Sequence, residues 1–232
     1  MRAALAAGAQ CASEPEADGA RDRPVAPAVE PVLKRPFDFV LALTGIILSA
    51  PVWLAIALAI KLEDGGPVLY VQQRWGKNRE GFTAYKFRSM VANADEKWGS
   101  LQATEDDPRI TRMGKLLRAT ALDEMPQLLN ILKGDMSFVG PRALPMNEVQ
   151  VREEGDGLPD KEIPGFDERL RVRPGLTGIA QIYAPRDVPR KEKFEYDLVY
   201  IRKQSFVYDL RLIILSFLIT FRGRGEVRAK KI

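Results

Sequence analysis

The stretch "FVLALTGIILSAPVWLAIALAIK", residues 39–61, carries 22 consecutive uncharged residues before its final lysine. As a straight helix with a rise of roughly 1.5 Å per residue, these residues would reach about 33 Å, which is enough to cross a bilayer. Hydropathy alone therefore predicts a single transmembrane helix. Pro51, near the middle, favours a bent path, because proline removes a backbone donor and clashes with the preceding turn.

The charges that flank this stretch bear on the same question. Lys34 and Arg35 precede it and Lys61 ends it, so the preference of basic residues for the cytoplasm is most simply met if both ends lie there. In a bent helix, the hydroxyl groups of Ser49 and Thr44 are candidates to satisfy the carbonyls that the bend frees. The residues leave two paths open, a helix that crosses and a helix that enters and returns.

Composition excludes several kinds of chemistry. The chain has 232 residues, a length typical of one domain, and its 35 basic against 31 acidic residues suit an anionic ligand or a membrane surface rather than nucleic acid. Cys11 is the single cysteine and histidine is absent, so an internal disulfide, a histidine triad and the common zinc sites are excluded. Acid–base or nucleophilic chemistry must use carboxylates, Lys, Tyr or Ser.

The domain organisation follows from composition along the chain. Residues 1–33 are rich in Ala, Pro and acidic residues and predict a disordered tail. Residues 34–62 form the membrane helix, 63–222 a folded domain of mixed α/β, helix-rich class, and 223–232 a basic C-terminal tail. Within the domain, the acidic residues 148–169 are expected to form a surface excursion.

Local patterns predict the main elements of this domain. Residues 68–72 and 82–87 are typical of two short strands joined by a polar loop. Near the C-terminus, two helices are expected, separated near Gln204 and Ser205. The uncharged run at residues 212–221 is too short to span a membrane, and suits an amphipathic helix in the interface or a helix packed on the core.

A second stretch, "LDEMPQLLNILKG" at residues 122–134, combines an apolar helical face with charged residues at its start. Pro126 is tolerated only in a first turn, so the helix should begin near Leu122 or Asp123. Asp123 and Glu124 then lie at a helix N-terminus, which favours ionised carboxylates and welcomes phosphate. Such an acidic pair is most often a simple cap.

Two arginines beside this pair favour a chemical role. Arg118 precedes the pair and Arg142 follows it on a Gly-Pro turn. Carboxylates flanked by arginines suit phosphoryl chemistry, because Arg neutralises developing charge while an Asp can act as nucleophile or hold a divalent metal.

Four ordered motifs carry a family resemblance: "KRPFDFVLAL" (34–43), "YKFRSM" (85–90), "LDEMPQLLNILKGDMSFVGPR" (122–142) and "VRPGLTGIAQ" (172–181). From Lys34 to Phe221 the chain resembles the bacterial sugar transferase family, the monotopic phosphoglycosyl transferases. The resemblance implies transfer of a sugar phosphate from a nucleotide-diphosphate sugar, usually a UDP-sugar, to undecaprenyl phosphate with Mg²⁺. It also implies a catalytic domain on the cytoplasmic face of a bacterial inner membrane.

The resemblance assigns expected roles to individual residues. Asp123 would be the nucleophile and a Mg²⁺ ligand, and Glu124 its partner. The residues expected to bind phosphate are Arg118, Arg142 and Lys86, and those expected on the nucleotide-sugar side are Arg173, Gln181 and Arg186. For Arg173 a turn-fixing role is the alternative.

The chain departs from the family pattern at two places near these residues. Ala143 follows Arg142 where many members have Pro. Many members also have Asn-Gly-Arg one residue after the Ala-Gln that ends the fourth motif, whereas residues 183–186 of this chain read Tyr-Ala-Pro-Arg. Contacts to the sugar in that loop are therefore open, with Arg186 as a candidate replacement.

The resemblance also bears on the path of the apolar stretch. Family members carry a re-entrant helix broken at a proline that Pro51 matches, although Ala50 precedes it here where many have Ser. We therefore expect a re-entrant membrane helix broken at Pro51 and in contact with membrane lipids. A non-catalytic anchored module that binds polyprenyl phosphate or a partner protein is the alternative function. The identity of the sugar, the pathway and the formation of a homo-oligomer stay open.

Overall fold

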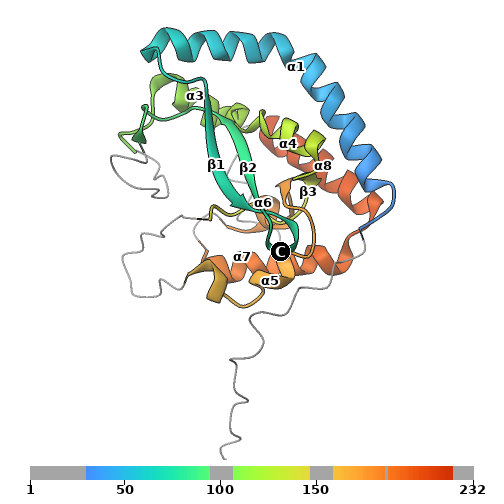
Figure 1. Cartoon of the computed structure of the whole chain (residues 1–232). Helices are drawn as coiled ribbons and strands as arrows, with labels where there is room; N and C mark the ends of the chain where they lie inside the picture. Colours follow the sequence, from blue (N-terminus) through green and yellow to red (C-terminus); the bar gives the residue numbers. More distant parts are fainter. Residues whose placement is uncertain (1–29, 95–106, 147–158, 186–187, 222–232) are drawn as a thin grey trace, which may run out of the picture.

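The computed structural model describes residues 30–94, 107–146, 159–185 and 188–221 (Figure 1). It confirms the mixed α/β, helix-rich class, with two small sheets among the helices. The predicted tails, residues 1–33 and 223–232, lie outside the described residues, except for residues 30–33. The elements are α1 (Lys34–Asp64), β1 (Leu69–Trp75), η1 (Lys77–Arg79), β2 (Gly81–Phe87), α3 (Arg112–Thr120), η2 (Leu122–Glu124), α4 (Gln127–Lys133), β3 (Ser137–Val139), η3 (Asp160–Glu162), α5 (Phe166–Arg169), β4 (Gly175–Thr177), α6 (Ile179–Tyr183), α7 (Arg190–Lys203) and α8 (Phe206–Phe221).

Helix α1 runs without interruption through Pro51, so the predicted break is not confirmed. The helix nevertheless changes direction in its middle part, and it arches over the rest of the fold (Figure 1). Ser49 Oγ donates to Gly45 O at 2.6 Å, a back-bond of the kind that bends helices. Among the described residues, α1 is the one helix long and apolar enough to cross a membrane.

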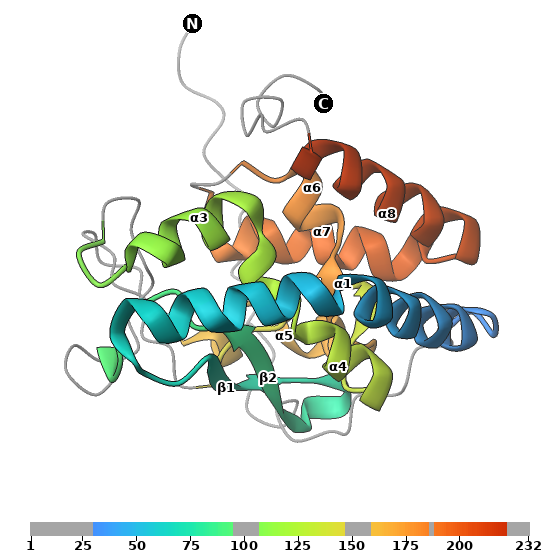
Figure 2. The ribbon, with the colours of Figure 1, turned by 90° about the horizontal axis from the view of Figure 1, so that it is seen from above.

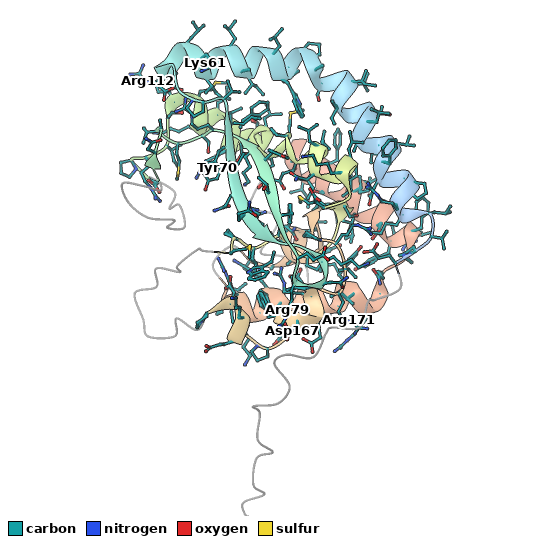
Figure 3. The ribbon with its side chains drawn as sticks, viewed as in Figure 1. Lys61, Tyr70, Arg79, Arg112, Asp167 and Arg171 are labelled. Atoms are coloured by element: carbon teal, nitrogen blue, oxygen red, sulfur yellow. The ribbon has the colours of Figure 1, made fainter. Side chains whose placement is uncertain are left out.

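Both ends of α1 are tied to the same folded domain. At its start, Lys34 Nζ donates to Asp209 Oδ2 at 2.5 Å, and Arg35 Nη2 donates to Leu132 O at 2.7 Å. At its end, Asp64 forms a salt bridge with Arg88. The end of α1 also lies beside the start of α3, where Figure 3 labels Lys61 and Arg112. The helix is therefore fixed to the domain at both ends.

The two sheets match the strand prediction in part. Strands β1 and β2 pair antiparallel, from Leu69 opposite Phe87 to Trp75 opposite Gly81, and they confirm the predicted hairpin with a longer first strand. Strands β3 and β4 pair in parallel, with Ser137 opposite Gly175. These three-residue strands lie in segments too short and irregular for an alternating pattern to be recognised.

Helix α4 packs against both α1 and β2, and in the view from above it lies beside the hairpin and next to α1 (Figure 2). Leu128 and Ile131 of α4 pack in one core cluster with Ala42 of α1 and with Phe82 and Ala84 of β2. This packing fixes the start of α4, and with it the preceding acidic pair, against the β2 strand.

The two predicted C-terminal helices are confirmed as α7 and α8, separated at residues 204 and 205. Leu212 of α8 is buried in a core cluster with Tyr200 of α7. Another face of α8 is exposed and apolar, with Val207, Leu210, Ile214, Phe217 and Leu218 at helical spacing. Helix α8 therefore combines a buried face with an apolar surface.

The prediction of a surface excursion over residues 148–169 is wrong for its described second half. Ile163 and Phe166 are buried in a cluster with Phe194, and Trp75 packs against it. These apolar side chains are dispersed among acidic residues, so average composition concealed them.

Candidate active site

A carboxylate at the centre of the candidate site accepts from two cations. Lys86 Nζ donates to Glu124 Oε1 at 2.7 Å, and Arg142 Nη2 donates to the same oxygen at 3.2 Å. The side chains of Lys86 and Glu124 are 17% and 20% exposed, whereas that of Arg142 is 49% exposed. The cluster therefore has a buried side and a side open to a ligand from solvent.

The two carboxylates of this site have pKa values shifted in opposite directions. Burial acts to raise the pKa of Glu124, but the charges of Lys86 and Arg142 outweigh it and lower that pKa well below its usual value. Burial raises the pKa of Asp123, and the Lys86 charge offsets this only in part. The pKa of Lys86 is lowered because burial disfavours its charged form. Glu124 is thus held ionised, while Asp123 is the more basic carboxylate.

Asp123 and Glu124 lie in the single turn η2, rather than in α4 itself. Ala121 precedes the turn in the left-handed region, at φ 57°, and its N–H caps α3 by donating to Arg118 O. Sequence analysis expected the helix itself to begin near Leu122 or Asp123, whereas the structure has a single helical turn there and begins α4 at Gln127. It also did not anticipate that burial raises the pKa of Asp123.

A buried asparagine brings β2 against this turn. Asn130, fully buried in α4, donates from Nδ2 to Thr83 O at 2.7 Å and accepts at Oδ1 from Tyr85 N at 3.1 Å. Both partners lie in β2, and Tyr85 directly precedes Lys86. Sequence reasoning missed this role, although an Asn within the apolar run of residues 128–132 was a usable signal.

Arg118 approaches the same site from α3. Its Nε donates to Ser89 Oγ at 2.9 Å, and its charge lowers the pKa of Asp123, against the dominant effect of burial. The structure therefore places Lys86 and Arg142 in contact with Glu124, and Arg118 within electrostatic reach of Asp123. Phosphate binding by these three residues stays a prediction.

The residues expected on the nucleotide-sugar side are less closely joined to this cluster. Arg173 forms a salt bridge with Glu30, and its Nε donates to Gly134 O at 2.8 Å, at the end of α4. In Gln181, both polar atoms of the side-chain amide are buried without a partner among the described residues. Arg186 lies outside the described residues. Binding of the sugar nucleotide by these residues stays a prediction.

The carboxylates of this site suit Mg²⁺ only together with a substrate. Among the described residues, no group of three or more His, Cys, Asp or Glu side chains could hold a metal ion. Magnesium is commonly bound by one or two carboxylates together with substrate phosphates and water, and Asp123 beside Glu124 offers such a set.

Comparison with known sequences connects this geometry with a family. A model of the family "Bacterial sugar transferase" matches residues 29–223, which contain the whole site. The chain belongs to the bacterial sugar transferase family.

The relatives of this sugar transferase include a protein that the alignment covers almost completely and proteins that it covers by less than half. The chain is 42% identical over 200 residues to the "Exopolysaccharide production protein PSS" of Rhizobium leguminosarum bv. phaseoli, covering 84% of this chain and 98% of that protein. It is also 42% identical over 202 residues to the "UDP-glucose:undecaprenyl-phosphate glucose-1-phosphate transferase" of Escherichia coli (strain K12), covering 84% of this chain but 41% of that protein.

A third relative is named for a different sugar. The chain is 40% identical over 196 residues to the "UDP-N-acetylgalactosamine-undecaprenyl-phosphate N-acetylgalactosaminephosphotransferase" of Aeromonas hydrophila, covering 83% of this chain and 44% of that protein. The chain thus spans less than half of these two longer relatives. The identity to the relative named for glucose is thus close to the identity to the relative named for N-acetylgalactosamine.

Proposed function

We propose that this sugar transferase moves a sugar 1-phosphate from a UDP-sugar to undecaprenyl phosphate, giving undecaprenyl-diphosphate-sugar and UMP. Its place would be the first membrane step in the assembly of a polysaccharide such as an exopolysaccharide. The observation that carries the proposal is the contact of Lys86 and Arg142 with one oxygen of Glu124, next to the more basic Asp123. Relatives named for this type of reaction support it.

In the proposed mechanism, the reaction proceeds in two displacements. An Asp123 carboxylate oxygen attacks the phosphorus that bears the sugar, and the bond from that phosphorus to the bridging oxygen breaks, so that UMP leaves with the electron pair. A phosphate oxygen of undecaprenyl phosphate then attacks the same phosphorus and releases Asp123 as a carboxylate. The acceptor is already anionic at neutral pH, so this second step needs little help from a base, consistent with a chain that has no histidine.

The cations of the site would bind the phosphates during both displacements. The Arg142 guanidinium is half exposed and offers several donors, which suits a phosphate arriving from solvent. Lys86 keeps Glu124 ionised, so Glu124 would act as a fixed negative partner rather than as a second nucleophile. Mg²⁺ would be held by Asp123 and by substrate phosphates, and when bound it reduces repulsion between the carboxylate and the diphosphate.

We further propose that α1 is a re-entrant membrane helix and that the catalytic domain lies on the cytoplasmic face of a bacterial inner membrane. Supporting this, both ends of α1 contact the one folded domain, through Lys34 and Arg35 at the start and Asp64 at the end. A helix that crossed the membrane would place its ends on opposite sides. The apolar side chains exposed along α1, such as Ile47, Leu48, Leu54, Leu58 and Leu62, would contact lipid.

The exposed apolar face of α8 supports the same placement. Its exposed residues would lie in the membrane interface, as expected for an amphipathic helix. The alternative function, a non-catalytic anchored module, would not require a largely buried acidic pair beside three cations. The family and its enzymatic relatives favour the transferase.

The decisive experiment measures nucleotide release from a panel of UDP-sugars. Purified protein in detergent, supplied with Mg²⁺ and undecaprenyl phosphate, should release UMP from at least one UDP-sugar and form the matching lipid-linked diphosphate sugar. Release of UDP in place of UMP would contradict the proposal, because it would mean transfer of the sugar without its phosphate. A protein that binds the lipid but releases no UMP with any sugar of the panel would favour the anchored module.

A further inference from the structure

The segment that carries Arg142, residues 140–146, is fixed at its beginning by the parallel strand β4. Gly140 N donates to Thr177 O at 2.9 Å, and Gly175 N donates to Pro141 O at 2.9 Å. A Cβ atom on Gly140 would lie 2.3 Å from Arg173 O, so the backbones approach more closely than any other residue would permit. This end of the segment therefore has little freedom to move.

The other end of the segment is fixed by the antiparallel hairpin. Trp75 N donates to Leu144 O at 2.9 Å, and Met146 N donates to Gln73 O at 3.0 Å. These bonds extend the edge of β1, so residues 144–146 continue the hairpin sheet. Arg142 and Ala143 lie between the two fixed ends.

The carbonyls of these two middle residues accept from two buried arginines of distant elements. Arg169 Nη2, in α5, donates to Arg142 O at 2.7 Å, and Arg74 Nη1, in β1, donates to Ala143 O at 3.2 Å. Arg169 is 2% exposed and Arg74 is 7% exposed. Two buried cations thus hold consecutive carbonyls directly beside the side chain that contacts Glu124.

Each of the two arginines is itself held in place. Arg169 Nη2 donates to Asp197 Oδ2 at 2.8 Å, and its guanidinium lies 4.4 Å from the ring centroid of Phe194, both residues of α7. Arg74 Nη2 donates to Gln72 Oε1 at 2.9 Å, in its own strand. Burying these two cations carries a desolvation cost, which their bonds to Asp197, to Gln72 and to the two carbonyls offset.

We propose that Arg74 and Arg169 are positioning residues that act through Arg142. Arg142 has a long side chain that is half exposed, so its guanidinium can occupy many positions unless the main chain beneath it is fixed. By holding the carbonyls of residues 142 and 143, the two arginines limit these positions to those near Glu124 and the reacting phosphate. The inference rests on the proposed function for its effect on catalysis, but its geometry can be tested independently.

The kinetic test is a double-mutant cycle with Arg142. Arg169→Lys keeps a cation for Asp197, and Arg74→Lys keeps a charge near Gln72, but a single ammonium group cannot reproduce the planar fork that also reaches the carbonyl. Each change should lower kcat/KM for UMP release by roughly 10- to 100-fold in the otherwise unchanged protein. In an Arg142→Ala background, the same changes should lower it by less than about twofold, because the residue through which they act is gone.

A purely structural role predicts a different pattern. Loss of packing would reduce activity by the same factor in both backgrounds, and such additivity would overturn the proposal. The melting temperature serves as the comparison for kcat/KM. Arg169→Lys and Arg74→Lys should each lower the melting temperature by the same amount in the wild-type and the Arg142→Ala backgrounds. If Arg169→Lys does not fold, Arg169→Met with Asp197→Leu replaces the buried pair by apolar groups and also removes the bond to Arg142 O.

Hydrogen exchange tests the geometry without reference to activity. Amide exchange in a peptide covering residues 140–146 should become faster in Arg169→Lys and Arg74→Lys, while exchange in α8 stays unchanged. Arg79→Lys is the matched control, because Arg79 pairs with Asp167 of the same α5 helix at the surface (Figure 3). Unchanged exchange at 140–146 in both variants would overturn the proposal. Absence of UMP release by the wild-type protein would instead overturn the proposed function.

Discussion

Lys86 Nζ and Glu124 Oε1 lie 2.7 Å apart, although 38 residues separate them in the chain. The pair joins the end of strand β2 to the turn that precedes α4, and the same Glu124 oxygen accepts from Arg142. Because this arrangement keeps Glu124 ionised, the negative charge beside Asp123 is a permanent feature of the site near neutral pH.

This arrangement predicts the pH dependence of the first displacement. Asp123 must be ionised to attack, and burial raises its pKa, so the rate should fall at a higher pH than for an ordinary aspartate as the solution is acidified. Lys86→Met removes a charge that lowers the pKa of Asp123, so the acid limb of the pH–rate profile, where the rate falls on acidification, should move to higher pH. Glu124→Gln removes a charge that raises it, so the limb should move to lower pH.

The measurement is single-turnover UMP release between pH 4 and 8, compared as profiles normalised to each variant's maximum. Both variants also lose activity, so the position of the limb, and not its height, is the readout. Movement of the Lys86→Met limb to lower pH would show that Asp123 is not the titrating group.

Much of this site was accessible from the sequence, for identifiable reasons. Asp123 and Glu124 are neighbours, and Pro126 with Gly134 limits the helix that follows them, so local rules placed the pair near a helix start. The hairpin and the two C-terminal helices likewise follow from alternation and from helical apolar faces.

The remaining features depend on tertiary contacts that local patterns do not encode. The approach of Lys86 to Glu124 requires the fit of Asn130 onto β2, and the two arginines behind Arg142 bind main-chain carbonyls, which any residue carries. Burial also opposes an expectation, because it raises the pKa of Asp123, whereas a helix N-terminus was expected to favour the ionised carboxylate. Expected sugar contacts, by contrast, remain predictions for Arg173 and Gln181.

The arginines of the site should not tolerate lysine. Arg142 contacts Glu124 while half exposed, and Arg118 is held by Ser89 beside Asp123. Arg→Lys at either position should lower kcat/KM by about tenfold or more, equivalent to about 1.4 kcal/mol of transition-state stabilisation, because lysine lacks the planar fork of donors. Steady-state UMP release measures this, with Arg79→Lys as a surface control. Near-wild-type turnover in both variants would assign the two arginines a structural role.

The buried contact at the start of α1 should contribute strongly to stability. Lys34 and Asp209 side chains are each 5% exposed, and Lys34 Nζ also donates to Val139 O at 2.9 Å. Lys34→Met leaves Asp209 buried without its cation, which should cost about 3–5 kcal/mol. Lys61→Met at the exposed end of α1 is the control, and should change stability by less than about 0.5 kcal/mol. Thermal unfolding in detergent compares the variants, and equal midpoints would contradict the expected cost.

The membrane path of α1 can be tested from both of its ends. In a protein with Cys11 replaced, a cysteine placed at Pro31 and another at Gly65 should both react with an impermeant thiol reagent from the cytoplasmic side. The reason is that both ends of α1 contact the one catalytic domain. Labelling of the two positions from opposite faces would show that the helix crosses the membrane.

Pro51→Ala should reduce activity by straightening the helix and moving the domain relative to the lipid.

The covalent intermediate is the most specific consequence of the proposed mechanism. Enzyme incubated with its UDP-sugar and Mg²⁺, but without lipid acceptor, should gain the mass of one sugar phosphate on the peptide that contains Asp123. It should release one equivalent of UMP at the same time, because the first displacement does not need the acceptor. Mass spectrometry of the intact protein and of its peptides measures both.

Substitutions in the acidic pair distinguish this mechanism from direct transfer. Asp123→Asn should abolish both the adduct and turnover, since an amide cannot replace the carboxylate nucleophile. Glu124→Gln should slow turnover while the adduct still forms, because Asp123 remains in place and Lys86 and Arg142 lose only their shared anionic partner. Full turnover by the Asp123→Asn protein, or intersecting double-reciprocal plots with no adduct at any time, would instead require a ternary complex in which the lipid phosphate attacks the UDP-sugar directly.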